Sequence, residues 1–266
     1  MLTHSSIGYS GRLGNQMFQY AALKALSLET GFKCFLPNHL AIKPDGAFDL
    51  TNNKWLEYKL DLLECFQITS PIQKNTLTST YQEKGFTFDP GISLVGDNTA
   101  IEGYFQSYKY FEAFAKDIKK EFTFKPSILE KCKNIILKYT NPVSIHIRRG
   151  DYVNHPAFWT VTPEYVINAL QAFNPGAKAT YLVFSDDIEW CKEIFGEDFV
   201  FVEGNNQYED LCLMSLCKHN IIANSSYSWW GAWLNSNKNK KVVAPSQWFT
   251  DGKSLKDLYP KDWIII

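Results

Sequence analysis

Short apolar runs alternate with amphipathic stretches along the second half of the chain. The runs have the length and the β-branched content of buried strands. The predicted strands are residues 143–147, 180–185, 199–202, 220–223 and 241–244. The predicted helices between them are residues 162–173, 188–195, 208–218 and 226–235. This alternation predicts an α/β fold in which helices cover both faces of a parallel sheet.

Polar side chains follow three of these strands directly. Arg148 and Arg149 come after the first strand, Asp186-Asp187 after the second, and Asn224-Ser225-Ser226 after the fourth. In parallel sheets of this kind, ligands bind at the carboxyl ends of the strands, which share one edge. The three segments therefore predict one site at that edge.

The first half of the chain is less regular. Residues 11–16 read as a glycine-containing loop, a helix is predicted from 17 to about 30, and 33–36 is a candidate strand. Prolines and glycines interrupt residues 38–100. Further helices are predicted over 107–122 and from 126 toward 139. We expect a domain boundary near residue 140, which gives domains of 1–140 and 141–266.

Composition narrows the class of protein. The 266 residues allow one large domain or two modest ones, and the formal net charge of −1 provides no basic surface for nucleic acid. The amino terminus lacks the features of a signal peptide, and no apolar run approaches the roughly 20 residues of a membrane helix. A cytoplasmic location is therefore expected, and peripheral contact with the inner face of the membrane is left open.

The cysteines and aromatic residues indicate an ordinary buried core. The six cysteines form no CxxC pair, and in a protein that is not exported they are expected to be free, buried thiols. Aromatic residues make up 15% of the chain, with eight tryptophans. Large aromatic side chains are mostly buried, so Trp229, Trp230 and Trp233 are expected in the core rather than against a glycan.

The end of the first predicted strand has the residues of an anion site. His146 and Arg148 are two residues apart and therefore share one strand face. Guanidinium groups match phosphate oxygens in a bidentate fork, which suggests a phosphorylated ligand and in particular a nucleotide. His146 is either a hydrogen-bonded core residue or a group that orients the ligand. Asp151 either holds one arginine in place or contacts the ligand.

Two further segments offer backbone N–H groups to an anion. Gly14 and Asn15 lie in the 11–16 loop before a helix, which serves either as an ordinary turn or as a cradle for a phosphate. Asn224, Ser225 and Ser226 stand at a strand-to-helix junction. Capping alone needs one polar residue there, so the others favour a bound anion.

Asp186, Asp187 and His155 allow more than one role. Two adjacent carboxylates are weak evidence for a metal, and at a helix start one of them is an ordinary cap. The functional alternative is a carboxylate that accepts hydrogen bonds from a guanine edge. His155 is either an exposed loop residue or a general base. No metal site is predicted.

The motifs together resemble a known family. The segment that starts at Gly11 (GRLGNQMFQYA) resembles the N-terminal signature of bacterial α-1,2-fucosyltransferases, glycosyltransferase family 11. The segment that starts at His146 (HIRRGDY) is similar to a motif shared by α-1,2- and α-1,6-fucosyltransferases and, in looser form, by protein O-fucosyltransferases. Residues 184–187 (FSDD) and 222–234 (IANSSYSWWGAWL) also resemble motifs of this family, and their order fits over almost the whole chain.

This resemblance implies a fold and a reaction. The implied fold is GT-B-like, with two Rossmann-like domains that face each other across a cleft, the first on the acceptor side and the second binding the donor. The implied reaction moves L-fucose from GDP-β-L-fucose to the 2-hydroxyl of a terminal β-galactoside. It inverts the anomeric centre to give an α-1,2 linkage, and it needs no metal ion or other cofactor.

The resemblance also implies roles for single residues. Arg148 is the implied ligand of the β-phosphate. Arg149 is predicted beside it among the donor-binding residues, although the family's motif leaves it structural or on the acceptor side. The guanine contact falls on Asp186 or Asp187, with Asp187 favoured. Ser225 and Ser226 are implied phosphate contacts, and Asn15 is placed near the pyrophosphate and the reacting sugar. Gly14 and Asn224 are further candidate donor-binding residues.

The catalytic base is open at this point. The segment after Asp151 lacks the histidine that relatives often carry some residues later, which leaves His155 as a candidate beside Arg148, Asn15 and His146. A strong base is not essential if the protein stabilises the departing GDP. Two other interpretations stay open: a fucosyltransferase with a different acceptor or linkage, and a non-catalytic sugar- or nucleotide-binding module. Residues 38–106 are expected to decide the acceptor.

Overall fold

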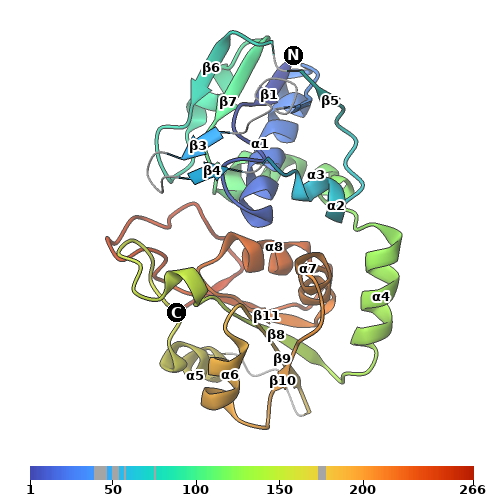
Figure 1. The fold of residues 1–266 in the computed structure, drawn as a ribbon, viewed down its shortest axis with the longest axis vertical. Coiled ribbons are helices and arrows are strands. Elements are labelled where there is room, and N and C mark those ends of the chain that lie inside the picture. Colours follow the sequence, from blue (N-terminus) through green and yellow to red (C-terminus); the bar gives the residue numbers. More distant parts are fainter. Residues whose placement is uncertain (39–46, 50–53, 57, 75, 173–177) are drawn as a thin grey trace. The chain divides into compact units, whose positions relative to one another are not determined.

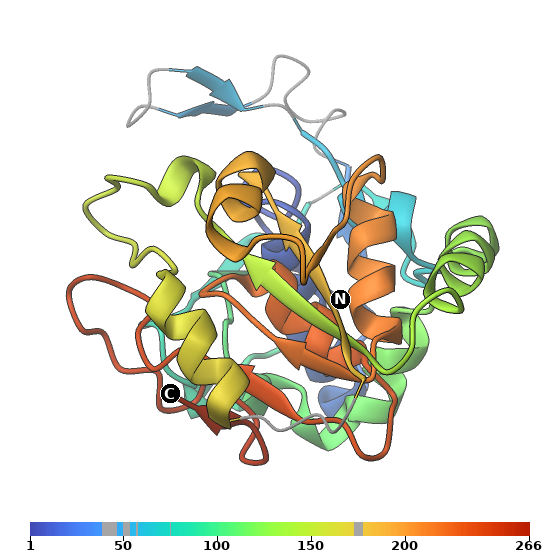
Figure 2. The same cartoon turned by 90° about the horizontal axis from the view of Figure 1, so that it is seen from below.

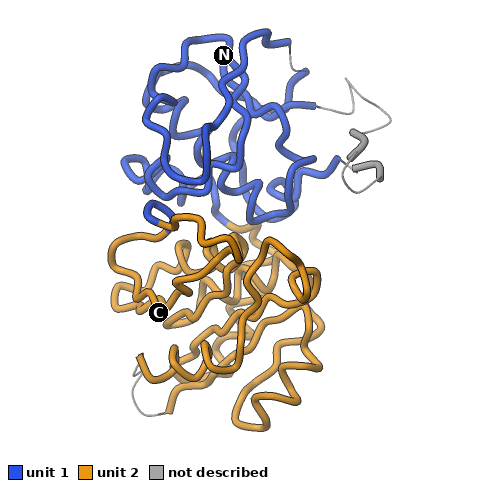
Figure 3. The backbone as a smooth tube through the Cα atoms, turned by 90° about the vertical axis from the view of Figure 1, so that its left-hand side faces the viewer, with its two compact units in different colours: residues 1–123, 256–258 blue, residues 124–255, 259–266 orange. Residues whose placement is uncertain are grey.

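The computed structural model describes residues 1–38, 47–49, 54–56, 58–74, 76–172 and 178–266. It divides into two compact units (Figure 3). Unit 1 contains Met1–Thr123 and Lys256–Leu258, and unit 2 contains Phe124–Leu255 and Tyr259–Ile266. Parts of the 38–106 region expected to decide the acceptor lie outside the described residues.

The two compact units divide between residues 123 and 124, whereas the sequence predicts a domain boundary near residue 140. Helix α4 (Pro126–Ile136) causes the difference, because it packs against α7 (Gln207–Leu216) of unit 2. Cys132 Sγ of α4 donates a hydrogen bond to the Glu209 carbonyl of α7 over 3.4 Å. A helix that precedes the first strand of unit 2 therefore belongs to the helical layer of that unit.

Unit 2 alternates strands and helices as the sequence predicts. Its strands are β8 (Pro142–Ile147), β9 (Thr180–Ser185), β10 (Val200–Phe201), β11 (His219–Ile221), β12 (Val242–Ala244) and β13 (Ile264–Ile265). Its helices besides α4 and α7 are α5 (Pro163–Ala172), α6 (Ile188–Phe195) and α8 (Ser226–Leu234). The predicted strands and the helices α5 to α8 agree with these bounds to within two residues, apart from residue 173, which lies outside the described residues. Helix α4 ends at Ile136, before the predicted end near residue 139.

The sheet of unit 2 is parallel and has the strand order β10-β9-β8-β11-β12-β13 (Figure 1). The chain begins in the middle of this sheet at β8 and moves outward to β10. It then returns to the other side of β8 with β11. The direction of winding changes between β8 and β11, and this switch point is where α/β sheets of this kind bind their ligands. The predicted α/β class is confirmed.

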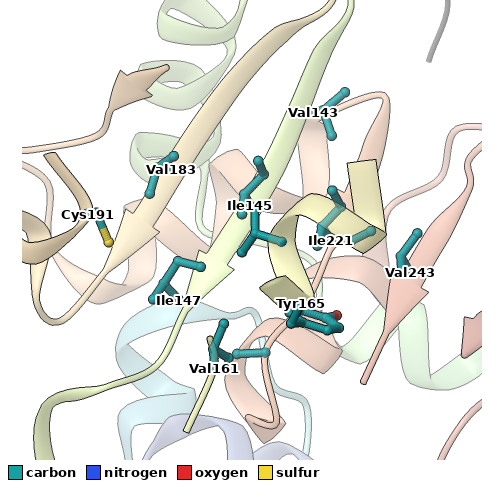
Figure 4. Packing of buried hydrophobic residues seen from close by; sticks show 12 residues of the cluster. Val143, Ile145, Ile147, Val161, Tyr165, Val183, Cys191, Ile221 and Val243 are labelled. Atoms are coloured by element: carbon teal, nitrogen blue, oxygen red, sulfur yellow. The ribbon is translucent and has the colours of Figure 1, made fainter. Parts of the chain in front are cut away.

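The main core of unit 2 lies between the sheet and helices α5 and α6 (Figure 4). Val143, Ile145 and Ile147 of β8 are completely buried on this side. Tyr165 of α5 and Cys191 of α6 pack against them. In the view from below, α5 lies in front of the strands (Figure 2). Alternation along β8 thus gives the sheet one apolar face, as the sequence predicts.

The opposite face of the sheet is covered by α7 and α8 (Figure 1). Polar residues on this face are held by hydrogen bonds, as buried polar groups require. Asn220 Nδ2 donates to Ser144 Oγ over 2.7 Å and to the Met214 carbonyl of α7 over 2.8 Å. Both faces of the sheet are therefore covered, which a parallel sheet needs.

Unit 1 is built on a smaller parallel sheet with the order β1-β7-β6. The elements of unit 1 are β1 (Leu2–His4), α1 (Leu13–Thr30), β2 (Leu36–Pro37), β3 (Ala47–Asp49), β4 (Lys54–Leu56), α2 (Asp61–Cys65), β5 (Ile72–Gln73), β6 (Ser79–Gln82), β7 (Thr99–Glu102) and α3 (Ala115–Glu121). Helix α1 ends at Thr30, as predicted, and Gly31 follows it in the left-handed region (φ 76°). The candidate strand at 33–36 is displaced, because β2 begins only at Leu36.

The helix predicted over 107–122 is wrong for its first half. Short 3-10 turns at Tyr108–Tyr110 and Glu112–Phe114 precede α3. Phe111 between them has a non-helical backbone (φ −138°, ψ 8°), and its fully buried ring packs on Phe18, with 6.1 Å between the ring centroids. Tertiary packing of this ring therefore overrides the helical propensity of the segment.

The predictions for cysteine and tryptophan are confirmed. All six cysteines are free and buried. Trp229 and Trp230 are completely buried in α8, and Trp233 is 9% exposed. Among the described residues, no helix has the length and hydropathy to cross a membrane.

Candidate functional site

The carboxyl ends of three neighbouring strands gather the predicted polar residues of unit 2. Strand β8 lies between β9 and β11 in the sheet. The register pairs Ile147, the last residue of β8, with Ser185, the last residue of β9. The two residues that follow on each strand therefore leave the sheet side by side at the switch point.

Arg148 is held by two carboxylates and an aromatic ring. Its Nη1 lies 2.7 Å from Asp186 Oδ2, and its Nη2 pairs with Asp151. Its Cζ lies 5.1 Å from the centroid of the Tyr152 ring, within the range of a cation–π contact. Asp151 therefore holds an arginine in place, the first of the two roles considered for it.

Arg149 has a separate set of partners. Its Nε donates to Asp187 Oδ2 over 3.2 Å, and its Cζ lies 3.8 Å from the centroid of the Trp190 ring. Its backbone N–H donates to Asp186 Oδ1 over 2.9 Å. Sequence reasoning missed Trp190, whose only local signal is its spacing of three residues from Asp187 at a helix start. A contact of Asp186 or Asp187 with guanine stays a prediction.

Gly150 lets the two strand ends approach each other. A Cβ atom at this position would lie 2.3 Å from Asp186 Oδ2, the oxygen that pairs with Arg148. No real Cβ atom tolerates that distance, so the carboxylate would have to move. The glycine of the HIRRGDY segment is thus explained by close packing.

Replacement of Gly150 by alanine is expected to lower kcat/KM for the donor that the family resemblance implies by roughly 10- to 100-fold, since small displacements of positioned groups have effects of this size. The displaced Asp186 would no longer orient Arg148. Steady-state rates with varied donor measure the effect. Gly96→Ala is the matched control, because a Cβ there meets nothing within 4 Å. Equal rates for both variants would contradict this role of Gly150.

His146 is buried beneath this cluster. Its side chain packs against Tyr227 of α8, with 5.6 Å between ring centroids, and its Nδ1 has no hydrogen-bond partner among the described residues. Burial, together with the positive charge of Arg148, lowers the pKa of His146 to about 3. The imidazole is therefore neutral at physiological pH and too weak to act as a general base there.

His155 lies in the exposed loop that follows the arginines. Its Nδ1 accepts a hydrogen bond from the Ala157 N–H over 3.1 Å, and its ring packs on Phe158 with 4.7 Å between centroids. The accepting Nδ1 leaves the proton on Nε2 in the neutral ring. Its role as a base stays a prediction.

The segment after β11 separates into two kinds of residue. Asn224 is completely buried, and its Nδ2 donates to the Trp159 carbonyl over 2.6 Å and to the Trp248 carbonyl over 2.9 Å. The amide group of Asn224 thus links the loop at Trp159 to the loop at Trp248. Ser225 precedes α8 with an extended backbone and without a capping bond from its side chain, and Ser226 is the first residue of the helix. The serine hydroxyls stand at a helix N-terminus, which favours an anion.

Asp210 is a second residue that sequence reasoning missed. It lies in the first turn of α7, which follows β10 and so begins at the same edge of the sheet. Asn205 Nδ2 donates to Asp210 Oδ1 over 3.2 Å. Burial raises the pKa of Asp210 to about 6. A carboxyl group kept in such surroundings at a strand-end edge is a candidate for ligand contact.

Asp210→Asn is expected to stabilise the fold above pH 7 by on the order of 2 kcal/mol and to change little at pH 4. The folded state binds the proton more tightly than the unfolded state, so stability falls as pH rises from about 4 through the folded pKa near 6. Thermal unfolding at both pH values measures this. Glu209→Gln is the control, and it is expected to lower the stability at neutral pH rather than raise it, because a hydrogen bond from Lys131 lowers the pKa of Glu209. A gain for Asp210→Asn that is equal at both pH values would contradict the burial argument.

The remaining predicted residues belong to unit 1. Gly14 and Asn15 lie in the first turn of α1, which begins at Leu13, rather than in a loop. Asn15 Oδ1 accepts a hydrogen bond from Gln106 Nε2 over 2.7 Å. Gly11 has a φ of 88°, and a Cβ there would lie 2.3 Å from Asn15 Nδ2, so only glycine suits this turn.

Among the residues that the structure describes, no group of three or more His, Cys, Asp or Glu side chains could hold a metal ion. The positive charge at the strand ends comes from Arg148 and Arg149. The arrangement can bind an anion at the switch point of unit 2, with serine hydroxyls and a helix N-terminus beside the arginines.

Known structures share this fold. A crystal structure of POFUT1 in complex with GDP-fucose superposes with a TM-score of 0.53, covering 91% of this chain and 96% of that one at 13% sequence identity. At that identity the likeness concerns the fold alone, and it confirms the GT-B-like α/β class.

Known sequences are more similar. The alpha-1,2-colitosyltransferase of Escherichia coli is 34% identical over 97% of this chain and 97% of its own length. The O-antigen biosynthesis glycosyltransferase WbnK of Escherichia coli is 33% identical over 96% and 98%. The galactoside 2-alpha-L-fucosyltransferase SEC1 of Bos taurus is 27% identical over 86% of this chain and 64% of its own length.

The motifs at the strand ends thus occur in a chain that matches its relatives along its length. The model of glycosyl transferase family 11 matches residues 3–266, which include the first turn of α1, both arginines and the serines at the start of α8. The chain belongs to glycosyltransferase family 11.

Proposed function

We propose that the protein is an inverting glycosyltransferase that moves L-fucose from GDP-β-L-fucose to the 2-hydroxyl of a terminal β-galactoside. The observation that carries the proposal is the pair of arginines at the carboxyl end of β8, beside the start of α8, in a chain of this family. Two guanidinium groups and a helix N-terminus suit the two phosphates of a nucleoside diphosphate. POFUT1, which shares the fold, was crystallised with GDP-fucose.

The proposed reaction is a single displacement. The acceptor oxygen attacks the anomeric carbon from the face opposite the phosphate, and the bond from that carbon to the phosphate oxygen breaks. The electron pair leaves with GDP, and the proton of the hydroxyl passes to a base or to water. Arg148 and the N–H groups at the start of α8 stabilise the charge that develops on the leaving phosphate.

The neutral imidazole of His146 does not supply a strong base for this step, because its pKa lies near 3. We propose that stabilisation of the leaving group provides most of the rate, with a loose, oxocarbenium-like transition state. Such a transition state depends more on the position of the acceptor hydroxyl than on full deprotonation of that hydroxyl. We further propose that the arginines take the place of a metal ion.

A second donor is a candidate because the relative with 34% identity is an alpha-1,2-colitosyltransferase. Colitose is L-fucose without its 3-hydroxyl. A site built to bond that hydroxyl rejects the deoxy sugar strongly, whereas a site without such a bond accepts both. Competition between GDP-fucose and GDP-colitose, with kcat/KM measured for each, separates the two activities.

Product analysis tests the proposal as a whole. The wild-type protein is incubated with GDP-fucose and a panel of β-galactosides, and the linkage of each product is determined. Fucose on the 2-hydroxyl of galactose is the expected result. Fucose on another hydroxyl would establish the alternative linkage. Binding of GDP-fucose without turnover on any acceptor would establish a non-catalytic binding module.

A further inference from the structure

We propose that Asp187 and Trp190 are positioning residues that present Arg149 as a second ligand of the donor's pyrophosphate, beside Arg148. The inference rests on the proposed function, because it takes a nucleoside diphosphate as the ligand at the end of β8. It adds to the proposed function the two side chains, Asp187 and Trp190, that orient the second of the two arginines.

The guanidinium of Arg149 is fixed from several directions. Trp190 covers one face, with 3.8 Å from Cζ to the ring centroid, which is direct stacking contact. Asp187 Oδ2 accepts the Nε–H over 3.2 Å, and the backbone N–H is bound by Asp186. The side chain is 17% exposed. A long side chain held in this way loses little further freedom when a ligand binds.

The remaining donors of this guanidinium are open. Within the described part of the chain, Nη1 and Nη2 of Arg149 have no hydrogen-bond partner, whereas both terminal nitrogens of Arg148 are paired with carboxylates. A guanidinium has five N–H donors, and the Nε–H is the one that Asp187 uses. The two terminal nitrogens form the fork that matches phosphate oxygens. Arg149 therefore offers an oriented, unoccupied edge at the strand ends.

The positions of Asp187 and Trp190 follow from α6. Asp187 immediately precedes this helix, and Trp190 lies three residues later in its first turn, so both side chains are on the same side of the helix start. Phe195, in the last turn of α6, packs against Trp190 in an edge-to-face contact, with 5.9 Å between the ring centroids and an interplanar angle of 86°. The face of Trp190 is thus set by packing that does not involve Arg149.

Trp190→Leu provides the test, with calorimetric titration of GDP and of guanosine into the whole protein. Loss of the stacked ring lets the guanidinium move, so the Kd for GDP is expected to rise about 10-fold, within the range of cation–π contacts. The Kd for guanosine, which lacks phosphates, stays unchanged. Trp190→Phe keeps an aromatic face and restores most of the GDP affinity. Arg149→Lys gives a similar loss, and combining it with Trp190→Leu adds little.

Tyr181→Leu is the matched control, because Tyr181 lies at the start of β9, where its ring packs on Phe199 with 5.5 Å between centroids, away from the strand ends where Arg149 lies. It is expected to lower the Tm while the ratio of GDP to guanosine affinity stays at the wild-type value. Asp187→Asn supplies a second variant if Trp190→Leu does not fold. It is expected to weaken GDP more than guanosine, because a contact of Asp187 with guanine would affect both ligands, whereas the displaced Arg149 affects GDP alone.

Two outcomes overturn the inference by itself: GDP affinity that is unchanged in Trp190→Leu and Asp187→Asn, or equal losses for GDP and guanosine. A wild-type protein that binds neither GDP nor GDP-fucose overturns the proposed function, and the assignment of Arg149 with it.

Discussion

Replacement of Arg148 by alanine is expected to lower kcat/KM for the proposed donor GDP-fucose by about 10²- to 10³-fold, the loss typical of one group that stabilises developing charge. Arg148 is expected to have this effect because it stands at the switch point of the sheet, where Asp186 and Asp151 fix both of its terminal nitrogens. Initial rates with varied donor measure the loss. The wild-type product must be established first, since the prediction concerns that reaction.

Two controls accompany this prediction. Arg148→Lys keeps the charge and loses the planar fork, so its rate should lie between those of the wild type and the alanine variant. The fold should survive the alanine substitution, because Asp186 retains the N–H of Arg149 as a partner. Circular dichroism and thermal unfolding verify this. Turnover by a folded Arg148→Ala variant at the wild-type rate would remove Arg148 from the site.

Trp229→Ala is expected to lower the free energy of unfolding by about 3–5 kcal/mol, as truncation of a large buried aromatic side chain does. The Trp229 ring is completely buried and lies against Trp230, with 4.9 Å between centroids, and against Trp263, with 5.3 Å. The neighbouring rings cannot close a cavity of that size. Urea unfolding, with the midpoint and the slope compared to the wild type, measures the loss.

The control for Trp229 is Leu137→Ala, at a side chain that is 82% exposed, where a change within about 0.5 kcal/mol is expected. The experiment also decides between the two roles of the tryptophans. Unchanged stability of Trp229→Ala, combined with weaker binding of a galactoside, would mean that this ring contacts glycan instead of core.

The Rossmann-like winding of unit 2 explains why distant motifs act together. β8 and β11 are neighbours although the HIRRGDY segment starts at His146 and the serine-rich segment starts 76 residues later at Ile222, and α5 to α7 fill the interval. Backbone pairing then sets the side chains: Ile147 is opposite Ser185, so each arginine meets the aspartate next in register. The same pairing accounts for Gly150, which allows Asp186 to reach across.

Several structural features followed from the sequence alone. The alternation of apolar runs gave the strands and helices of unit 2, because strand and helix periods are local properties of the chain. The edge where the polar segments converge was predictable too, since the carboxyl ends of parallel strands share one edge. The burial of Trp229 and Trp230 and the free cysteines needed no more than composition and pattern.

The tertiary structure alone decided the partners of each side chain. That Asp186 pairs with Arg148, and Asp187 with Arg149, depends on the register of two strands, which no local pattern records. Trp190 could not be chosen among eight tryptophans before its ring was placed over a guanidinium. The boundary at residue 123 likewise depends on packing between helices distant in sequence. Local periodicity fixes elements, whereas contacts between distant residues fix the chemistry of the site.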